Sequence, residues 1–315
     1  MAWTSTAATF SAGIAVALLA MTPSPFTTLR TSVLSPLTHL ESSLWPPATT
    51  NTTTATGAAL APFVCSAHPY TTQIVSTEPL VIYIHDFLSP TEISTLLSLG
   101  ADLFKPSTTT KRGRSTKDTS RTSWSAALPL SSDAVQCVLS RAEAFMGTMH
   151  APGRDDIGAP QLVRYRPGQK FDLHHDWYPR PQRSMADGER GRDRRWNRPA
   201  SFFAVLEDGC EGGETYFPHV RDVAPQERAA EGRFPWRAHE EGGLAFRPVA
   251  GNALFWVNLF ANGTGDGRTR HAGLPVTDGV KTAMNIWPKQ YVGKDAWEEM
   301  VSKEVTEKEG REGME

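Results

Sequence analysis

Residues 168–176 read Gly-Gln-Lys-Phe-Asp-Leu-His-His-Asp and end in a His-x-Asp triplet. Successive side chains of a strand point to opposite faces, so in an extended chain His174 and Asp176 share one face while His175 points away. A third candidate, His271, stands far downstream. Two ligands from one strand and a third from a distant strand can build a 2-His-1-carboxylate iron site with open coordination positions. The pattern therefore predicts that His174, Asp176 and His271 bind a metal ion.

A lysine follows the last of these histidines by ten residues, at Lys281. In a strand over residues 281–287, the face that carries Met284 and Ile286 is apolar enough to pack on a helix, so the lysine face should look into the core. A lysine buried there is unfavourable unless an anion pairs with it, and a dicarboxylate ligand would supply that anion. The alternative is a lysine at the strand end with its ammonium group in solvent.

Length, charge and cysteine content limit the classes of protein. The chain has 315 residues, enough for one domain with appendages, and its formal net charge of -2 gives no reason to expect a nucleic-acid partner. The cysteines Cys65, Cys137 and Cys210 have no CxxC spacing, which excludes a thiolate zinc site and a disulfide framework. One disulfide remains possible, with Cys210 either free or paired with Cys137.

The chain divides into four predicted regions. Residues 1–24 hold an uncharged apolar run, typical of a signal peptide or signal anchor; an organellar presequence or a disordered start is the alternative. Residues 25–76 are a Ser/Thr/Pro-rich linker, residues 77–292 the folded domain and residues 293–315 a charged tail. The expected location is the secretory pathway, in the lumen or membrane of the endoplasmic reticulum, with a possible N-terminal membrane anchor.

Two helices are predicted ahead of most strands. Ser89 as N-cap, Pro90 at the first helical position and Glu92 form a capping box. That helix should end at Gly100, and an amphipathic helix should follow over residues 132–149. Three polar segments without apolar periodicity are expected to be loops or an insertion: 106–120, 178–199 and 219–242.

The remaining apolar runs are short and are separated by glycine and proline turns. Strands are predicted over residues 80–84, 161–165, 200–206, 215–217, 244–246, 253–257 and 281–287. Strands outnumber helices and no βαβ alternation occurs. The pattern predicts a mainly β protein with supporting helices (α+β), built on a double-stranded β-helix (jelly-roll) core.

Several of these motifs together resemble one enzyme family. They are FLSPTE, RTSW, VRYRPGQKFDLHHD, GGETYF, GNALFW and RHAGLPVTDGVKTAMNIW, in this order between Glu78 and Lys289. The segment resembles the catalytic domain of prolyl 4-hydroxylase-type 2-oxoglutarate- and Fe(II)-dependent dioxygenases. The resemblance implies a site in which His174, Asp176 and His271 hold Fe(2+).

The same resemblance implies the remaining roles and the reaction. Lys281 would pair with the distal carboxylate of the co-substrate 2-oxoglutarate, Tyr165 would hydrogen-bond the same end, and Trp287 would form an aromatic wall for the substrate. The reaction would be that of a procollagen-proline 4-dioxygenase-like enzyme. It would use O2, with ascorbate as a further cofactor, to hydroxylate an unactivated C–H, and would release succinate and CO2. The expected target is C4 of prolyl residues in a peptide or protein.

Two other functions remain open from the sequence. A free amino acid or another small metabolite could be the substrate on the same scaffold, with the arginines of residues 178–199 binding its acidic group. A non-catalytic jelly-roll binding module is the third hypothesis, and the intact His174, Asp176, His271 and Lys281 argue against it.

Overall fold

The computed structural model describes residues 63–111, 114–116, 119–184, 194–223, 234–293 and 296. All of these belong to one compact unit. The predicted signal or anchor segment, most of the predicted linker and almost all of the charged tail lie outside the described residues. Within the part that is described, no helix is long and apolar enough to cross a membrane.

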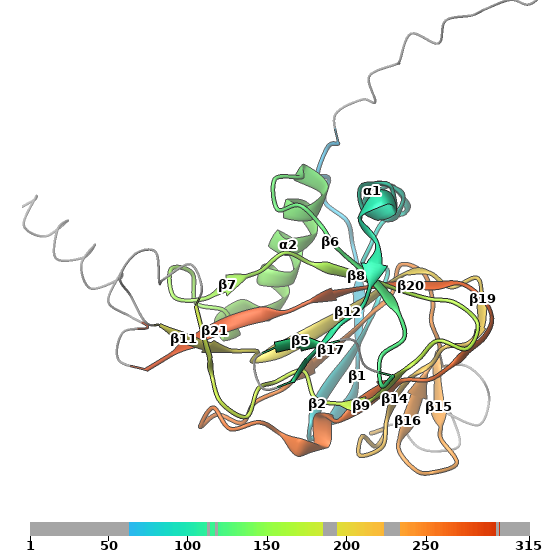
Figure 1. Cartoon of the computed structure of the whole chain (residues 1–315). Coiled ribbons are helices and arrows are strands. Elements are labelled where there is room, and N and C mark those ends of the chain that lie inside the picture. Colours follow the sequence, from blue (N-terminus) through green and yellow to red (C-terminus); the bar gives the residue numbers. More distant parts are fainter. Residues whose placement is uncertain are drawn as a thin grey trace, which may run out of the picture. The chain divides into compact units, whose positions relative to one another are not determined.

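The larger sheet has eight antiparallel strands (Figure 1). In spatial order they are β1 (Thr71–Thr77), β2 (Leu80–His85), β17 (Ala253–Val257), β12 (Ala200–Glu207), β20 (Lys281–Ile286), β8 (Gln161–Tyr165), β6 (Trp124–Ala127) and β3 (Lys105–Pro106). The predicted strands over residues 80–84, 161–165, 200–206, 253–257 and 281–287 all lie in this sheet.

The second sheet has five antiparallel strands and carries both histidines of the predicted metal site. In order they are β15 (Trp236–Ala238), β16 (Leu244–Phe246), β14 (Thr215–Phe217), β18 (His271–Gly273) and β9 (Phe171–His174). The sheets pack face to face: the Phe217 and Trp256 rings lie 5.3 Å apart, and the Tyr83 and Trp236 rings 5.4 Å. Two antiparallel sheets around one core confirm the predicted jelly roll.

Both predicted helices are present, as α1 (Pro90–Gly100) and α2 (Asp133–Met146). They cover the outer face of the larger sheet, where Phe202, Phe255 and Met284 pack against them (Figure 1). The capping box of α1 forms as predicted, because Ser89 Oγ accepts from the Glu92 amide and Glu92 Oε2 accepts from the Ser89 amide. The helices therefore buttress the side of the sheet opposite the site.

Shorter elements complete the described part. They are β4 (Thr109–Lys111), β5 (Arg114–Thr116), β7 (Asp156–Ile157), β10 (Gln182–Arg183), β11 (Arg195–Asn197), β13 (Cys210–Gly212), β19 (Val276–Gly279) and β21 (Pro288–Val292). Single 3-10 turns cover Ala101–Leu103, Gly147–Met149 and Gly267–Thr269.

The three segments predicted as loops or an insertion contain strands, so that prediction is wrong in part. Segment 106–120 holds the β4–β5 hairpin, and segment 178–199 holds the antiparallel β10–β11 pair, which extends to β21. In segment 219–242, β15 pairs with β16. These strands form by backbone pairing with neighbours, which needs no apolar alternation of their own, and pattern reading therefore missed them.

Order also begins earlier than predicted. β1 (Thr71–Thr77) lies within the segment predicted as linker and forms an edge of the larger sheet, where polar side chains face solvent. Upstream of β1, Cys65 forms a disulfide with Cys137 of α2. Cys210 is free, which was one of its two predicted states.

Candidate metal centre and co-substrate pocket

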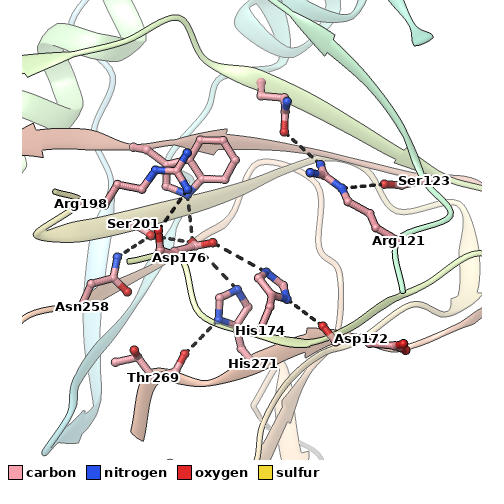
Figure 2. A network of polar contacts seen from close by, with 12 residues as sticks. Arg121, Ser123, Asp172, His174, Asp176, Arg198, Ser201, Asn258, Thr269 and His271 are labelled. Atoms are coloured by element: carbon pink, nitrogen blue, oxygen red, sulfur yellow. Dashed lines mark hydrogen bonds and ion pairs between the residues drawn. The ribbon is translucent and has the colours of Figure 1, made fainter. Parts of the chain in front are cut away.

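The three predicted metal ligands, His174, Asp176 and His271, come together at β9 and β18 of the smaller sheet. His174 ends β9 and His271 begins β18, and the two residues are direct cross-strand partners. Asp176 lies just beyond the end of β9, so only His174 of the predicted pair is on a regular strand. One ligand atom from each of the three side chains lies within 4.8 Å of the others (Figure 2). The structure brings together the metal site that the sequence predicts.

Each histidine is held in the tautomer that a metal requires. His174 Nδ1 lies 2.8 Å from the Asp172 carbonyl oxygen, and His271 Nδ1 lies 3.0 Å from the Thr269 carbonyl oxygen. A carbonyl oxygen only accepts, so both Nδ1 atoms carry the proton and donate. The Nε2 lone pairs then point at the Asp176 carboxylate, at 3.7 Å and 4.0 Å.

This arrangement fits a metal ion. With both rings neutral, two nitrogen lone pairs and a carboxylate converge in one buried space, which is unfavourable unless a cation separates them. Imidazole and carboxylate are also the ligands of non-haem Fe(II) sites with open positions. The donor set and the tautomers therefore suit Fe(2+). The two backbone carbonyl oxygens that accept from the Nδ1–H groups hold the rings in place, as hydrogen-bond partners of metal-binding histidines commonly do.

Burial and charge set the protonation of the ligands. Burial, with a smaller effect of the neighbouring His271, lowers the pKa of His174 to about 3, so the ring is neutral near pH 7. Burial alone would raise the pKa of Asp176, but the nearby His271, His174 and Arg198 and the Trp287 hydrogen bond lower it to about 2. His174 and Asp176 are thus ready to bind a cation without losing a proton.

A pocket extends from the metal ligands into the core between the two sheets. The side chains and backbone that line it come from both sheets: Arg121, Tyr165, Phe171, His174, Asp176, Phe203, Thr215, Trp256, His271, Ala272, Gly273, Asn285 and Trp287. Phe171 stacks on the His174 ring at a centroid distance of 3.6 Å, and the Arg121 guanidinium carbon lies over the Phe171 ring, 4.9 Å from its centroid. The pocket therefore combines the metal ligands and several other polar side chains with aromatic walls.

Lys281 lies beside the inner part of this pocket and is 1% exposed. Its Nζ donates to the Gly213 carbonyl oxygen at 2.6 Å and lies 3.5 Å from Thr215 Oγ1. Among the described residues, no carboxylate lies within ion-pair distance of it. Burial, the largest effect, lowers the pKa of Lys281 to about 8, and the neighbouring Cys210 and Glu214 act in the opposite direction. A buried ammonium with only neutral partners is a site for an anionic ligand.

Tyr165 is the direct cross-strand partner of Lys281, on β8. Its ring lines the pocket, and the Lys281 ammonium lies 5.7 Å from the ring centroid. Burial raises the pKa of Tyr165, so its hydroxyl keeps its proton and can donate. Lys281 therefore faces the core, as predicted, and Tyr165 lines the pocket beside it.

Trp287 follows β20 and lines the same pocket, but it also touches the metal site. Its Nε1 donates to Asp176 Oδ2 at 2.9 Å, and the Arg198 guanidinium stacks over its ring at 3.8 Å. Sequence reasoning placed this ring near the substrate and missed the hydrogen bond. His175 behaves as predicted: its Nε2 lies 3.2 Å from the Gly267 carbonyl oxygen and it is no member of the metal-binding group.

Sequence reasoning missed Arg121 and Thr215, which line the pocket, and Ser201 and Asn258, which form a hydrogen-bond chain to Asp176. A signal for Thr215 and Ser201 was available, since each is a polar residue within an otherwise apolar short strand. Arg121 stands in the RTSW motif, which contributed to the family resemblance but was given no role of its own.

Comparison with known proteins gives matches over the same region. Residues 160–289 match the 2OG-Fe(II) oxygenase superfamily. The chain is 28% identical over 223 residues to prolyl 4-hydroxylase 1 of Arabidopsis thaliana, covering 69% of this chain and 71% of that protein. It is 34% identical over 127 residues to prolyl 4-hydroxylase subunit alpha-2 of Gallus gallus, covering 40% and 18%.

Solved structures include a similar protein. The viral collagen prolyl hydroxylase from Paramecium Bursaria Chlorella virus-1 has a TM-score of 0.47 at 21% identity, covering 72% of this chain and 99% of that chain. The sequence matches and the His-Asp-His group point the same way. These matches support a 2-oxoglutarate- and Fe(II)-dependent oxygenase of the prolyl 4-hydroxylase type.

Proposed function

We propose that this protein hydroxylates C4 of prolyl residues in a peptide or protein, with 2-oxoglutarate and O2 as co-substrates. The observation that carries the proposal is the combination of the metal-ready ligands with the buried Lys281 ammonium at one pocket. Relatives named prolyl 4-hydroxylases support the choice of substrate.

His174, Asp176 and His271 would hold Fe(2+), through the Nε2 atoms and a carboxylate oxygen. When bound, the iron supplies the oxidative decarboxylation of 2-oxoglutarate to succinate and CO2 together with oxygen insertion into a C–H bond. The protein's own contribution is to orient the ligands and to keep water from the pocket. No protein acid or base has to move a proton in this scheme.

Lys281 would bind the distal carboxylate of 2-oxoglutarate, and the Tyr165 hydroxyl would donate to the same group. Their cross-strand pairing fixes the two donors next to each other on rigid strands, where neither has to be ordered on binding. The ammonium would exchange its neutral partner, the Gly213 carbonyl, for an anion.

The substrate would bind at the outer end of the pocket, where Trp287 and Arg198 stack. An aromatic ring at this position would pack against the pyrrolidine ring of a proline. A proline-rich chain in the polyproline II conformation would reach the pocket already extended, which lowers its entropy loss on binding.

The protein would work in the secretory pathway, in the endoplasmic reticulum. The Cys65–Cys137 disulfide supports an oxidising compartment, and the apolar run within residues 1–24 supports a signal peptide or anchor. Ascorbate would keep the iron reduced, as the family resemblance implies.

Amino-acid analysis of treated peptides tests the proposal. The protein, Fe(2+), 2-oxoglutarate and ascorbate are incubated with a proline-rich peptide, the same peptide with every proline replaced by alanine, and free proline. 4-Hydroxyproline should form in the first sample only. Hydroxylation of free proline without reaction of the peptide would show that the substrate is a small molecule and not a peptide.

A further inference from the structure

The carboxylate of Asp176 uses its two oxygens in different ways. Oδ2 accepts from the Ser201 hydroxyl at 2.7 Å and from Trp287 Nε1 at 2.9 Å. Oδ1 has no such donor among the described residues and lies 3.7 Å from His174 Nε2. A carboxylate oxygen offers two lone-pair directions in its plane, so two donors occupy both at Oδ2. Oδ1, beside His174, therefore keeps its lone pairs free of hydrogen bonds, whereas Oδ2, which lies 4.0 Å from His271 Nε2, is already occupied by its two donors.

The direction of the hydrogen bonds at Ser201 is determined by its neighbours. An ionised carboxylate only accepts, so the Ser201 hydroxyl proton points to Asp176, and its oxygen then accepts from Asn258 Nδ2 at 2.8 Å (Figure 2). If the Asn258 amide were flipped, its oxygen would face the Ser201 hydroxyl. It would then compete with Asp176 for the single hydroxyl proton. Ser201 and Asn258 are completely buried.

We infer that Ser201, Asn258 and Trp287 are positioning residues that restrict Asp176 to one metal-binding oxygen, Oδ1. The inference rests on the metal centre of the proposed function. A carboxylate that bound through both oxygens would occupy one more coordination position. Restricting it to one would keep coordination positions open for 2-oxoglutarate and O2.

Each of the three positioning residues lies on or directly after a different strand of the larger sheet. Ser201 is on β12, Asn258 follows β17 and Trp287 follows β20, three neighbouring strands of the larger sheet. Asp176 comes from the segment after β9 of the smaller sheet, and its carbonyl oxygen accepts from Arg198. The larger sheet therefore holds the carboxylate while the smaller sheet holds both imidazoles.

Removal of the Ser201 hydroxyl tests the inference through metal binding rather than turnover. Co(2+) is titrated into the full chain and into Ser201→Ala, with and without 2-oxoglutarate, and the visible absorption reports affinity and coordination. We expect metal affinity to fall by about 10- to 100-fold, as for other outer-shell partners. We also expect the Co(2+) spectrum to change and the spectral response to 2-oxoglutarate to weaken, because a second oxygen competes for its position. Ser201→Thr, which restores a hydroxyl, should recover the wild-type spectrum.

Two further variants separate positioning from folding. Trp287→Phe removes the other donor to Oδ2 and keeps an aromatic ring, so it should change the spectrum in the same direction. Thr282→Val removes a buried hydroxyl that donates to Glu207 on the opposite face of β20, away from the metal, and should leave Co(2+) affinity unchanged. Wild-type affinity and an unchanged spectrum in both Ser201→Ala and Trp287→Phe would overturn the inference. A wild-type protein that binds no Co(2+) would instead overturn the metal centre and with it the proposed function.

Discussion

His174 and His271, far apart in the sequence, are direct cross-strand partners on β9 and β18, with ring centroids 4.3 Å apart. Because adjacent strands are fixed by backbone hydrogen bonds, the spacing of the two imidazoles is a property of the sheet itself. Their Nδ1–H groups donate to carbonyl oxygens two residues before each ring. The binding geometry therefore exists before a metal arrives, and only Asp176 depends on contacts from the other sheet.

Replacement of His174 by alanine should abolish stoichiometric Fe(2+) binding, since one of three ligands is lost. Isothermal titration under anaerobic conditions measures this. His175→Ala is the matched control, because His175 is the next residue and hydrogen-bonds only to the Gly267 carbonyl oxygen. Equal loss in both variants would contradict the assignment of His174 as the ligand.

Replacement of Lys281 by methionine should raise the KM for 2-oxoglutarate by at least about 100-fold, since breaking a buried ion pair costs about 3–5 kcal/mol. The methionine keeps most of the volume and removes the charge. Steady-state succinate formation against 2-oxoglutarate concentration gives the KM. A KM for the variant within a factor of a few of wild type would show that another residue binds the distal carboxylate.

The affinity for 2-oxoglutarate should fall as the pH rises through about 8. Burial lowers the pKa of Lys281 from 10.5 to about 8, so the free protein loses the positive charge in this range. Below that pH the ammonium is charged and pairs with the carboxylate; above it, binding must first take up a proton. The charged or titratable groups nearest to the ammonium are Cys210, Glu214 and Tyr165.

Binding of 2-oxoglutarate measured from pH 6 to 10 checks this dependence. In Lys281→Arg the guanidinium stays charged, so the fall in 2-oxoglutarate affinity with rising pH should disappear. Burial raises the pKa of the Cys210 thiol, and Cys210→Ala should therefore keep the wild-type dependence near pH 8. A flat profile in wild type would mean that Lys281 keeps its proton throughout.

Loss of the Cys65–Cys137 disulfide should lower the free energy of unfolding by about 2–5 kcal/mol. The bond links the segment before β1 to α2 across 72 residues of sequence. Denaturant unfolding of the Cys65→Ala/Cys137→Ala variant, compared with wild type, measures the loss. A matched Cys210→Ala variant lacks no disulfide and should unfold like wild type. Equal stability of all three proteins would show that the bond does not form.

Much of the site could be predicted from the sequence because it follows the period of a strand. Side chains alternate between the two faces of a strand. This alternation accounts for the shared face of His174 and Asp176 and for the core-facing position of Lys281 on β20. Asp176 lies beyond the end of β9, yet the chain stays extended enough to keep the pair together. The strand order that makes His271 the neighbour of His174 needed the tertiary structure.

The rest depended on contacts between residues remote in sequence. Ser201, Asn258 and Trp287 meet at Asp176 through hydrogen bonds that have no period and no fixed spacing. The partner of Cys137 was equally undetermined, because three cysteines allow more than one pairing. The strands inside the segments predicted as loops arise from pairing with β16 and β21 or within a hairpin, which local composition does not record.

Succinate formation that depends on a prolyl peptide tests the central claim most directly. The protein is supplied with Fe(2+), O2 and 2-oxoglutarate, and succinate and 4-hydroxyproline are quantified with and without a proline-rich peptide. The account predicts that the peptide raises succinate release and that one 4-hydroxyprolyl residue forms for each succinate released above the peptide-free rate. Succinate release that no prolyl peptide raises above the peptide-free rate would contradict it.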